Sequence, residues 1–183
     1  MRAWVLVLPM VVFLAGCQKA TPPASDPALV EPATFSAWPS VTDKPVRVGP
    51  VLWLYCRGPT PEEATARDAA AKLHGPHTEY SIVVRVSPEA SAAFREGKPL
   101  PTGAVVIKEK YADGSASGPL QGYAVMVKRA TGFDPGGGDW EYAFIALAPE
   151  RSVTRGRLAE CAGCHASARG TDYLFRSYGG AGR

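Results

Sequence analysis

Five consecutive residues near the C-terminus, CAGCH, combine two thiols and an imidazole at a fixed spacing. Cys161 and Cys164 lie three positions apart, and His165 follows directly. Two thiols at this spacing can both reach the vinyl groups on one porphyrin edge, and the next residue then lies under the iron, where imidazole is a proximal ligand. The motif therefore predicts one covalently attached haem c, with thioethers at Cys161 and Cys164 and the iron on His165. We expect the second ring nitrogen of His165 to be held by a backbone carbonyl or a water.

Zinc binding and dithiol redox chemistry are the competing interpretations of this motif. A structural zinc site needs four ligands, but the sequence has no second Cys pair, and His74 and His77 are distant and mismatched in spacing. A thioredoxin-like pair belongs in a strand–helix context near the start of a chain, whereas this motif lies in a strand-poor C-terminal segment. Haem attachment is the favoured interpretation.

The residue opposite His165 decides what such an iron does. Met126 is the only methionine beyond the first ten residues, and a Met/His pair would make an electron-transfer cytochrome. Its place in a predicted strand favours core packing instead. His74 and His77 flank a Gly-Pro turn, which favours surface positions. The sequence therefore favours an open distal position, which is a site for a small ligand or substrate.

The N-terminus has the pattern of an export signal. An apolar run at residues 3–15 follows one basic residue, and it is too short and wrongly flanked for a stable transmembrane helix. We predict a signal peptide at residues 1–16. The letters LAGC that end this stretch resemble the bacterial lipobox, so Cys17 is the predicted lipidation site, with an ordinary cleavage site as the alternative. Gln18 favours the outer membrane, and we expect a periplasmic, lipid-anchored protein of a Gram-negative bacterium.

Composition limits the remaining classes. The chain has 183 residues, 46% hydrophobic and 20% charged, which fits one domain of ordinary size and excludes a disordered chain or a many-span membrane protein. Its net charge is only +3, and no basic run occurs, so we expect no nucleic-acid partner.

Three segments follow from these patterns. Residues 1–16 are the signal peptide, and residues 17–45 are the lipidated Cys and a proline-rich linker whose last third packs on the domain. Residues 46–183 are the haem domain. Within it, Cys56 follows an apolar run and is predicted to be a buried thiol.

Alternating apolar residues and Gly-rich turns predict an antiparallel meander in the domain. Its strands are expected at 80–86, 104–111, 123–129 and 140–147, with a strand or extended core segment at 46–57. Helices are expected at 60–74 and 87–97. The predicted fold class is α+β, a mainly antiparallel sheet with short helices and a C-terminal CxxCH segment.

Four motifs, in order, carry a resemblance to a known family. They are Gly103 to Glu109 (GAVVIKE), Val125 to Lys128 (VMVK), Gly138 to Tyr142 (GDWEY), and Cys161 to His165 (CAGCH) followed by Asp172 to Phe175 (DYLF). The set resembles the cytochrome P-460 family, which includes the NO-binding cytochromes c′-β, and spans residues 80–178. The resemblance implies a largely β, usually homodimeric, periplasmic haem protein with five-coordinate iron, which exchanges electrons with partner cytochromes.

Two branches of that family differ on the distal side. In one, a lysine is cross-linked to the porphyrin and hydroxylamine is oxidised; here the resemblance points to Lys108, with Lys110 and Lys98 as alternatives. A strand-edge lysine in solvent is the other interpretation of Lys108. In the other branch there is no cross-link, aromatic residues cap the iron, and NO or CO binds. Phe94 and Phe133 are the candidate caps, with core packing as their alternative.

Hydroxylamine oxidation releases protons with electrons and needs a proton acceptor. Asp134 is the candidate, with Asp139 and Glu109 as further ones. An Asp-rich turn is the structural alternative for both aspartates.

Overall fold

The structure is a computed structural model, and it describes residues 26–42, 44–48, 60–62, 65–66, 80–112, 116–147 and 149–176. The predicted signal peptide, Cys17, Cys56, His74 and His77 lie outside the described residues. So does most of the predicted helix 60–74, of which positions 61–62 and 65–66 are helical. In the described part of the chain, no helix has the length and apolar character needed to cross a membrane.

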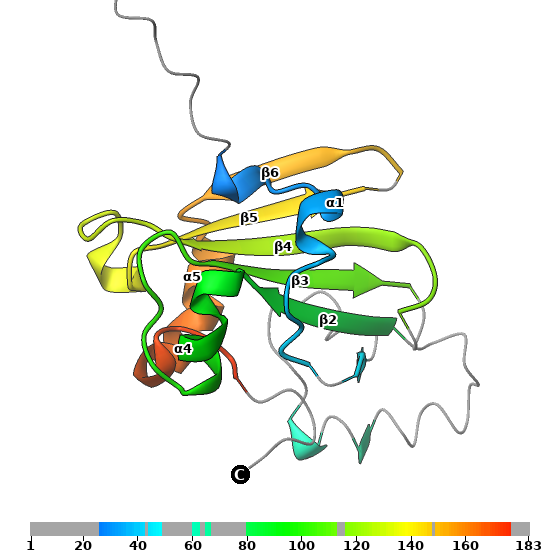
Figure 1. Ribbon diagram of the computed structural model, residues 1–183, viewed down its shortest axis with the longest axis horizontal. Coiled ribbons are helices and arrows are strands. Elements are labelled where there is room, and N and C mark those ends of the chain that lie inside the picture. The colour runs from blue at the N-terminus through cyan, green and yellow to red at the C-terminus, as the bar shows by residue number, and fades with distance from the viewer. Residues whose placement is uncertain are drawn as a thin grey trace, which may run out of the picture.

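Six antiparallel strands form one sheet in chain order, with β1 and β6 at its edges (Figure 1). The strands are β1 (Val46–Val48), β2 (Tyr80–Val86), β3 (Val105–Tyr111), β4 (Leu120–Lys128), β5 (Trp140–Ala146) and β6 (Ser152–Gly156). The predicted meander is confirmed, with the ends of the four predicted strands β2 to β5 within three residues of those observed. β6 was not predicted. Together with the short helices, the sheet confirms the α+β class.

Short helices occupy both faces of the sheet. They are η1 (Pro27–Leu29), α1 (Pro32–Phe35), η3 (Pro88–Ala90), α4 (Ser91–Arg95), η4 (Pro135–Gly137), α5 (Ala159–His165) and η5 (Ala166–Thr171). Residues of α4 and α5 pack in one hydrophobic cluster, and residues of η1 and α1 pack in another. The predicted helix 87–97 is divided between η3 and α4, and the chain leaves it at Gly97, which has φ +74°.

Strand register sorts the side chains between the two faces. Val106 pairs with Met126, and Met126 pairs with Tyr142, so these side chains form one cross-strand row. Because the side-chain period of a strand is two, Lys108 and Ala124 form the next row on the same face. We call this the site face.

The opposite face is covered by the N-terminal segment of the described chain. Ala28 and Phe35 are 0% and 1% exposed, and the Phe35 ring lies edge-on to Tyr123 at 4.9 Å. Burying a large apolar side chain of this kind contributes about 1.5–3 kcal/mol. The packed unit therefore includes residues 26–42, which lie within the segment assigned to a linker from sequence.

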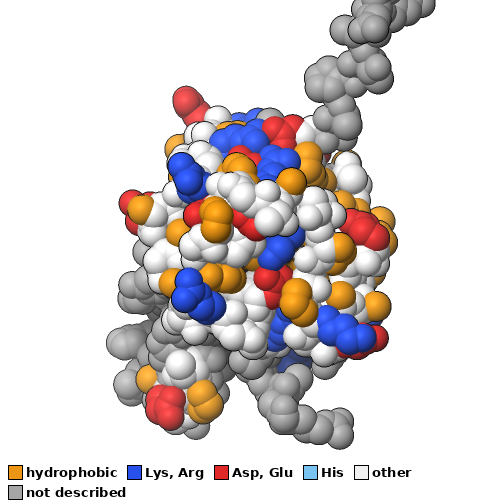
Figure 2. Space-filling view, turned by 90° about the vertical axis from the view of Figure 1, so that its left-hand side faces the viewer, with side chains coloured by type: hydrophobic (Ala, Val, Ile, Leu, Met, Phe, Trp, Pro, Cys, Tyr) orange, Lys and Arg blue, Asp and Glu red, His pale blue; other side chains and the backbone are white. Residues whose placement is uncertain are grey.

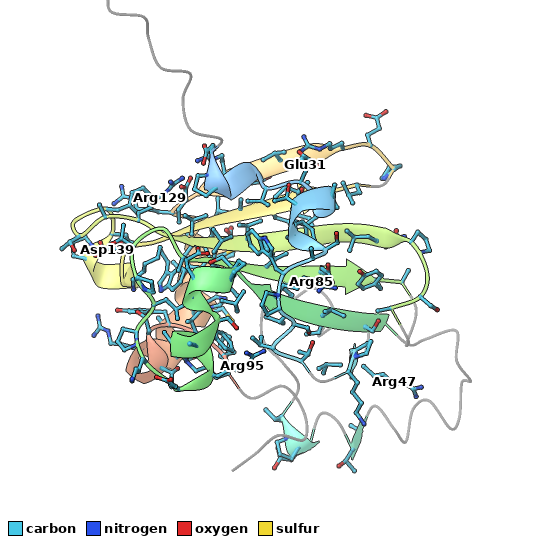
Figure 3. The ribbon with its side chains drawn as sticks, viewed as in Figure 1. Glu31, Arg47, Arg85, Arg95, Arg129 and Asp139 are labelled. Atoms are coloured by element: carbon cyan, nitrogen blue, oxygen red, sulfur yellow. The ribbon has the colours of Figure 1, made fainter. Side chains whose placement is uncertain are left out.

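Ion pairs hold the start of this segment to the sheet. Asp26 accepts hydrogen bonds from Arg155, from Arg129 at 3.2 Å and from the Ala28 N–H at 3.1 Å, and both arginines also bind Glu141 (Figure 3). The bond from Arg155, with those from Ala28 and Arg129, lowers the pKa of Asp26 from 3.8 to about 2. Elsewhere on the surface that Figure 2 presents, basic and acidic side chains are interspersed rather than gathered by sign.

This pKa shift predicts an acid-dependent contribution to stability. A carboxyl whose folded-state pKa is depressed stabilises the fold above its unfolded pKa of 3.8, and the stabilisation is lost as the pH falls toward about 2. Because Asp26 is partly exposed, we expect Asp26→Asn to lower the free energy of unfolding by about 1 kcal/mol at neutral pH. Urea unfolding of both proteins at several pH values measures this. A difference that stays constant down to about pH 2 would contradict the assignment.

Candidate functional site

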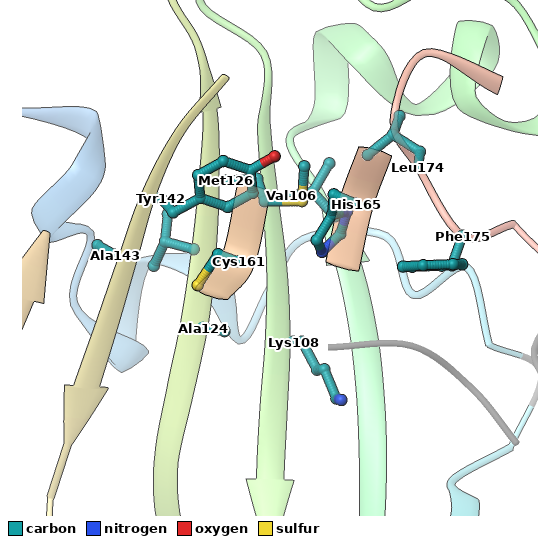
Figure 4. Close-up of a pocket in the computed structure, with 11 residues that line it drawn as sticks. Val106, Lys108, Ala124, Met126, Tyr142, Ala143, Cys161, His165, Leu174 and Phe175 are labelled. Carbon is teal, nitrogen blue, oxygen red and sulfur yellow. The ribbon is translucent and has the colours of Figure 1, made fainter. Parts of the chain in front are cut away.

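A mainly apolar pocket lies between the site face and α5, with an empty volume of about 420 Å³, part of it open to solvent (Figure 4). It is lined by Val106, Lys108, Ala124, Val125, Met126, Tyr142, Ala143, Cys161, His165, Leu174 and Phe175. The first seven come from β3, β4 and β5, and the others come from α5 and the C-terminal segment. The strand meander and the CxxCH motif thus meet at this pocket.

His165, the last residue of α5, is 2% exposed and lies with its ring in the pocket wall. Its Nδ1 is 2.6 Å from the backbone carbonyl of Tyr173. A carbonyl only accepts, so Nδ1 carries the proton and donates, which leaves Nε2 with its lone pair. Among the described residues, Nε2 has no hydrogen-bond partner. An imidazole with one nitrogen bound to a carbonyl and the other buried without a partner has the form of a metal ligand.

Two aromatic rings hold the imidazole in place. Tyr142 lies with its ring centroid 5.4 Å from that of His165, and Phe175 lies 5.0 Å from it. Both rings are tilted relative to the imidazole, at 48° and 57°. Such aromatic packing restricts the ring orientation.

The helix α5 explains how the motif presents its groups. Residues four apart share one face of a helix, so Cys161 and His165 both line the pocket. Cys164 is half-buried on the same helix and is not among the lining residues. These residues fit a haem group: Cys161 and Cys164 would hold its porphyrin, and His165 Nε2 would bind its iron.

The three lysine candidates have different surroundings. Lys108 is buried on β3 and lines the pocket, with its Nζ directed away from the row of Met126 and Tyr142 (Figure 4). Lys110 is buried on the same face but lies outside the pocket lining, 4.7 Å over the Phe144 ring. The Lys98 side chain is 69% exposed and pairs with a neighbouring glutamate. Of the three, only Lys108 is in the site.

The acid candidates lie elsewhere. Asp134 does not line the pocket; its backbone N–H donates to the Asp139 carboxylate at 2.9 Å, as does that of Gly132 at 3.1 Å. The structural alternative, an Asp-rich turn, therefore describes both aspartates. Glu109 is on the opposite face of the sheet, bound to Arg85 at 2.9 Å. A proton acceptor at Asp134 has no support in this geometry.

The aromatic candidates are likewise outside the pocket. Phe94 is buried in the core of the site face, under the guanidinium of Arg176 at 4.9 Å. Phe133 is 37% exposed on a turn. Two other aromatic residues, Tyr142 and Phe175, do line the pocket. Phe175 lies in the DYLF motif, but sequence alone does not show that it contacts His165.

Tyr173 was not predicted as a site residue, although its carbonyl holds His165. Its hydroxyl donates to the Gly136 carbonyl at 2.8 Å and accepts from Arg169 at 2.9 Å. Gly138, at φ +69°, lies where an added Cβ would be 2.4 Å from Cδ2 and 2.5 Å from Cε2 of that ring, at its edge. The glycine-rich loop at η4 thus packs against the residue that orients the imidazole.

A buried imidazole at the end of a CxxCH helix, facing an apolar pocket on an antiparallel sheet, defines a haem-binding cytochrome. The family pattern described as cytochrome P-460 matches residues 63–176, which is more than half of the chain. The chain belongs to the cytochrome P-460 family, and the resemblance noted from the motifs is confirmed. A comparison with the curated proteins found no match.

The close approach of Gly138 to Tyr173 predicts the cost of adding a methyl group. Gly138→Ala would place Cβ only 2.4 Å from Tyr173 Cδ2 and force a non-glycine residue into positive φ. Gly132→Ala is the matched control, since it has φ +96° and no atom near the added Cβ. We expect the strained backbone to lower the free energy of unfolding by about 1–2 kcal/mol at either site. At Gly138 the overlap with the ring should lower it by about 1–3 kcal/mol more. Equal losses in urea unfolding would show that the ring moves freely.

Proposed function

We propose that this protein is a c-type haem protein, with one haem bound by thioethers to Cys161 and Cys164 and its iron coordinated by His165 Nε2. The bare, buried Nε2 of His165, aimed at an apolar pocket, is the observation that carries the proposal. A neutral imidazole that donates through Nδ1 is the form in which histidine coordinates metals. Both thiols lie on α5 three positions apart, the spacing at which two thiols can reach the vinyl groups of one porphyrin edge.

We further propose an exported, lipid-anchored protein in the periplasm. The pattern of residues 1–16 and a lipid on Cys17 support this, as does the oxidising compartment in which haem c proteins mature. Partner cytochromes would exchange electrons with the haem, and a homodimer is proposed by family resemblance.

The distal side of the iron is proposed to be open to small ligands. Met126 lies in the same cross-strand row as Tyr142, and the Tyr142 ring contacts His165. Met126 therefore belongs to the wall around the proximal imidazole. Lys108 and Ala124 lie one row further along the site face. This placement supports a five-coordinate iron rather than a Met/His pair.

The activity we propose is the oxidation of small nitrogen species, hydroxylamine or NO, with electrons passed to partner cytochromes. When bound, haem supplies a redox-active iron that takes the ligand. The chain supplies His165 on the proximal side, apolar walls that exclude water, and Lys108 as the candidate for a porphyrin cross-link. Of the three candidate lysines, only Lys108 lines the pocket, and this supports the cross-linked branch.

Non-enzymatic binding of NO or CO, as in the cytochromes c′-β, is the second candidate function. The apolar lining supports it, because small uncharged gases need no polar partners to enter. It requires that Lys108 stays unmodified.

The absorption spectrum of the purified holoprotein, native and then in alkaline pyridine, separates these functions. We expect a red-shifted pigment that survives denaturation, and we expect Lys108→Arg to convert it to an ordinary c-type spectrum, because a guanidinium replaces the primary amine. Lys110→Arg is the matched control and should keep the abnormal pigment.

An ordinary pyridine spectrum in the unmodified chain would contradict the cross-link and favour gas binding. Absence of haem after expression with a maturation system would contradict the whole proposal. Loss of the abnormal pigment in Lys110→Arg alone would move the cross-link to Lys110.

The row position of Met126 predicts that it is not an iron ligand. Met126→Leu, which keeps the volume of a core side chain, should leave the ferric spectrum and the CO affinity of the ferrous protein unchanged. Spectrophotometric CO titration of both proteins measures this. CO binding that becomes much faster in the variant would instead assign Met126 as the sixth ligand and make the protein an electron carrier.

A further inference from the structure

A partly buried ion pair ties the C-terminal segment to the end of β4. Lys128 Nζ lies 2.5 Å from Asp172 Oδ1, although the residues are 44 positions apart. Their side chains are only 15% and 9% exposed. The second carboxylate oxygen, Oδ2, accepts a hydrogen bond from the Leu100 backbone N–H at 2.8 Å. Because both oxygens are bound, the Asp172 side chain has one position.

The backbone of Asp172 is held as well. The indole N–H of Trp140 donates to the Asp172 carbonyl at 2.9 Å. Lys128 Nζ also lies 4.8 Å over the Trp140 ring, so the same ammonium contacts both Asp172 and Trp140. The side chain of Asp172 is therefore bound to β4, and its carbonyl is bound to the neighbouring strand β5.

These contacts support a strained turn directly before the imidazole contact. Asp172 and Tyr173 both have φ +60°, the left-handed region that non-glycine residues rarely adopt. Such conformations persist only where the surroundings over-determine them. Here the turn directs the Tyr173 carbonyl to His165 Nδ1, at 2.6 Å.

We propose that Asp172 is a positioning residue, which through its bonds to Lys128 and Trp140 sets the hydrogen bond between the Tyr173 carbonyl and His165, and so sets the electron donation of the proximal imidazole to the iron. The inference rests on the proposed function in one respect, that His165 Nε2 binds the iron. Asp172 itself is not among the residues that line the pocket.

The physical consequence is a change in the iron, not only in stability. A short hydrogen bond from Nδ1 to a well-placed acceptor gives the imidazole more anionic character, which stabilises ferric iron and lowers the reduction potential. Releasing the turn would lengthen this bond and raise the potential.

The test compares Asp172→Asn and Lys128→Met with the unmodified holoprotein. Its readouts are the reduction potential and the iron–histidine stretching frequency of the ferrous protein. We expect the reduction equilibrium to shift about tenfold toward the ferrous state, which is about 59 mV for one electron, together with a lower frequency. The double variant should equal either single variant, since the two residues act as one unit. Lys128→Arg, which keeps a cation beside Asp172, should restore most of the original potential.

Glu141→Gln is the matched control, because it removes a buried ion-paired carboxylate on the opposite face of the sheet. It should lower stability without moving the potential or the frequency. If Asp172→Asn behaves in the same way, losing stability alone, the positioning role is wrong. If Asp172→Asn does not fold, Trp140→Phe, which removes the N–H bound to the Asp172 carbonyl together with part of the ring under Lys128, must shift both readouts in the same direction for the proposal to stand.

These outcomes test the iron ligand and the positioning role separately. An unmodified holoprotein that lacks an iron–histidine band overturns the ligand assignment, and the positioning role with it. A band that is present but unchanged in Asp172→Asn and Trp140→Phe overturns only the positioning role.

Discussion

The hydrogen bond from His165 Nδ1 to the Tyr173 carbonyl is the constraint on which the site depends. It selects the tautomer and leaves Nε2 bare in a buried pocket. A buried polar atom without a partner costs about 1–3 kcal/mol, so this arrangement is unfavourable until a ligand binds Nε2. Under the proposed function, binding of the haem iron at Nε2 would regain that cost.

Two adjacent residues at the end of β4 connect both terminal segments of the described chain to the sheet. Lys128 lies on the site face and binds Asp172, which precedes the Tyr173 carbonyl. Arg129 lies on the opposite face and binds Asp26 and Glu141. The alternation of a strand thus sends neighbouring charges to opposite faces. The contact between Arg129 and Asp26 stabilises the packing of the N-terminal segment on the sheet. The contact between Lys128 and Asp172 orients the His165 imidazole.

Sequence patterns predicted the elements that local forces determine, and they missed those that depend on contacts between distant residues. Strands β2 and β5 were predictable because buried strands alternate or are continuously apolar, and CxxCH is itself a local motif. The edge strand β6 (Ser152–Gly156) was missed because its side chains are mostly exposed and its pairing with β5 supplies the stability. Phe35 lies among prolines, which favoured a linker whose last third packs on the domain; in the structure the packing begins further back, at the buried Ala28. The Lys128–Asp172 pair spans 44 positions and leaves no periodic signal.

Among the candidate lysines, sequence favoured Lys108 only through the family resemblance, with Lys110 and Lys98 as alternatives. Lys108 and Lys110 share a face by the strand period, and sequence cannot tell which row meets the helix. The register of β3 with β4, which places Lys108 opposite Ala124 and one row from Met126, makes that choice. Because α5 and the sheet are both regular elements, the amine of Lys108 and the imidazole of His165 are held by rigid parts of the fold. Chemistry between that amine and a group bound along α5 then depends on strand register rather than on a mobile loop.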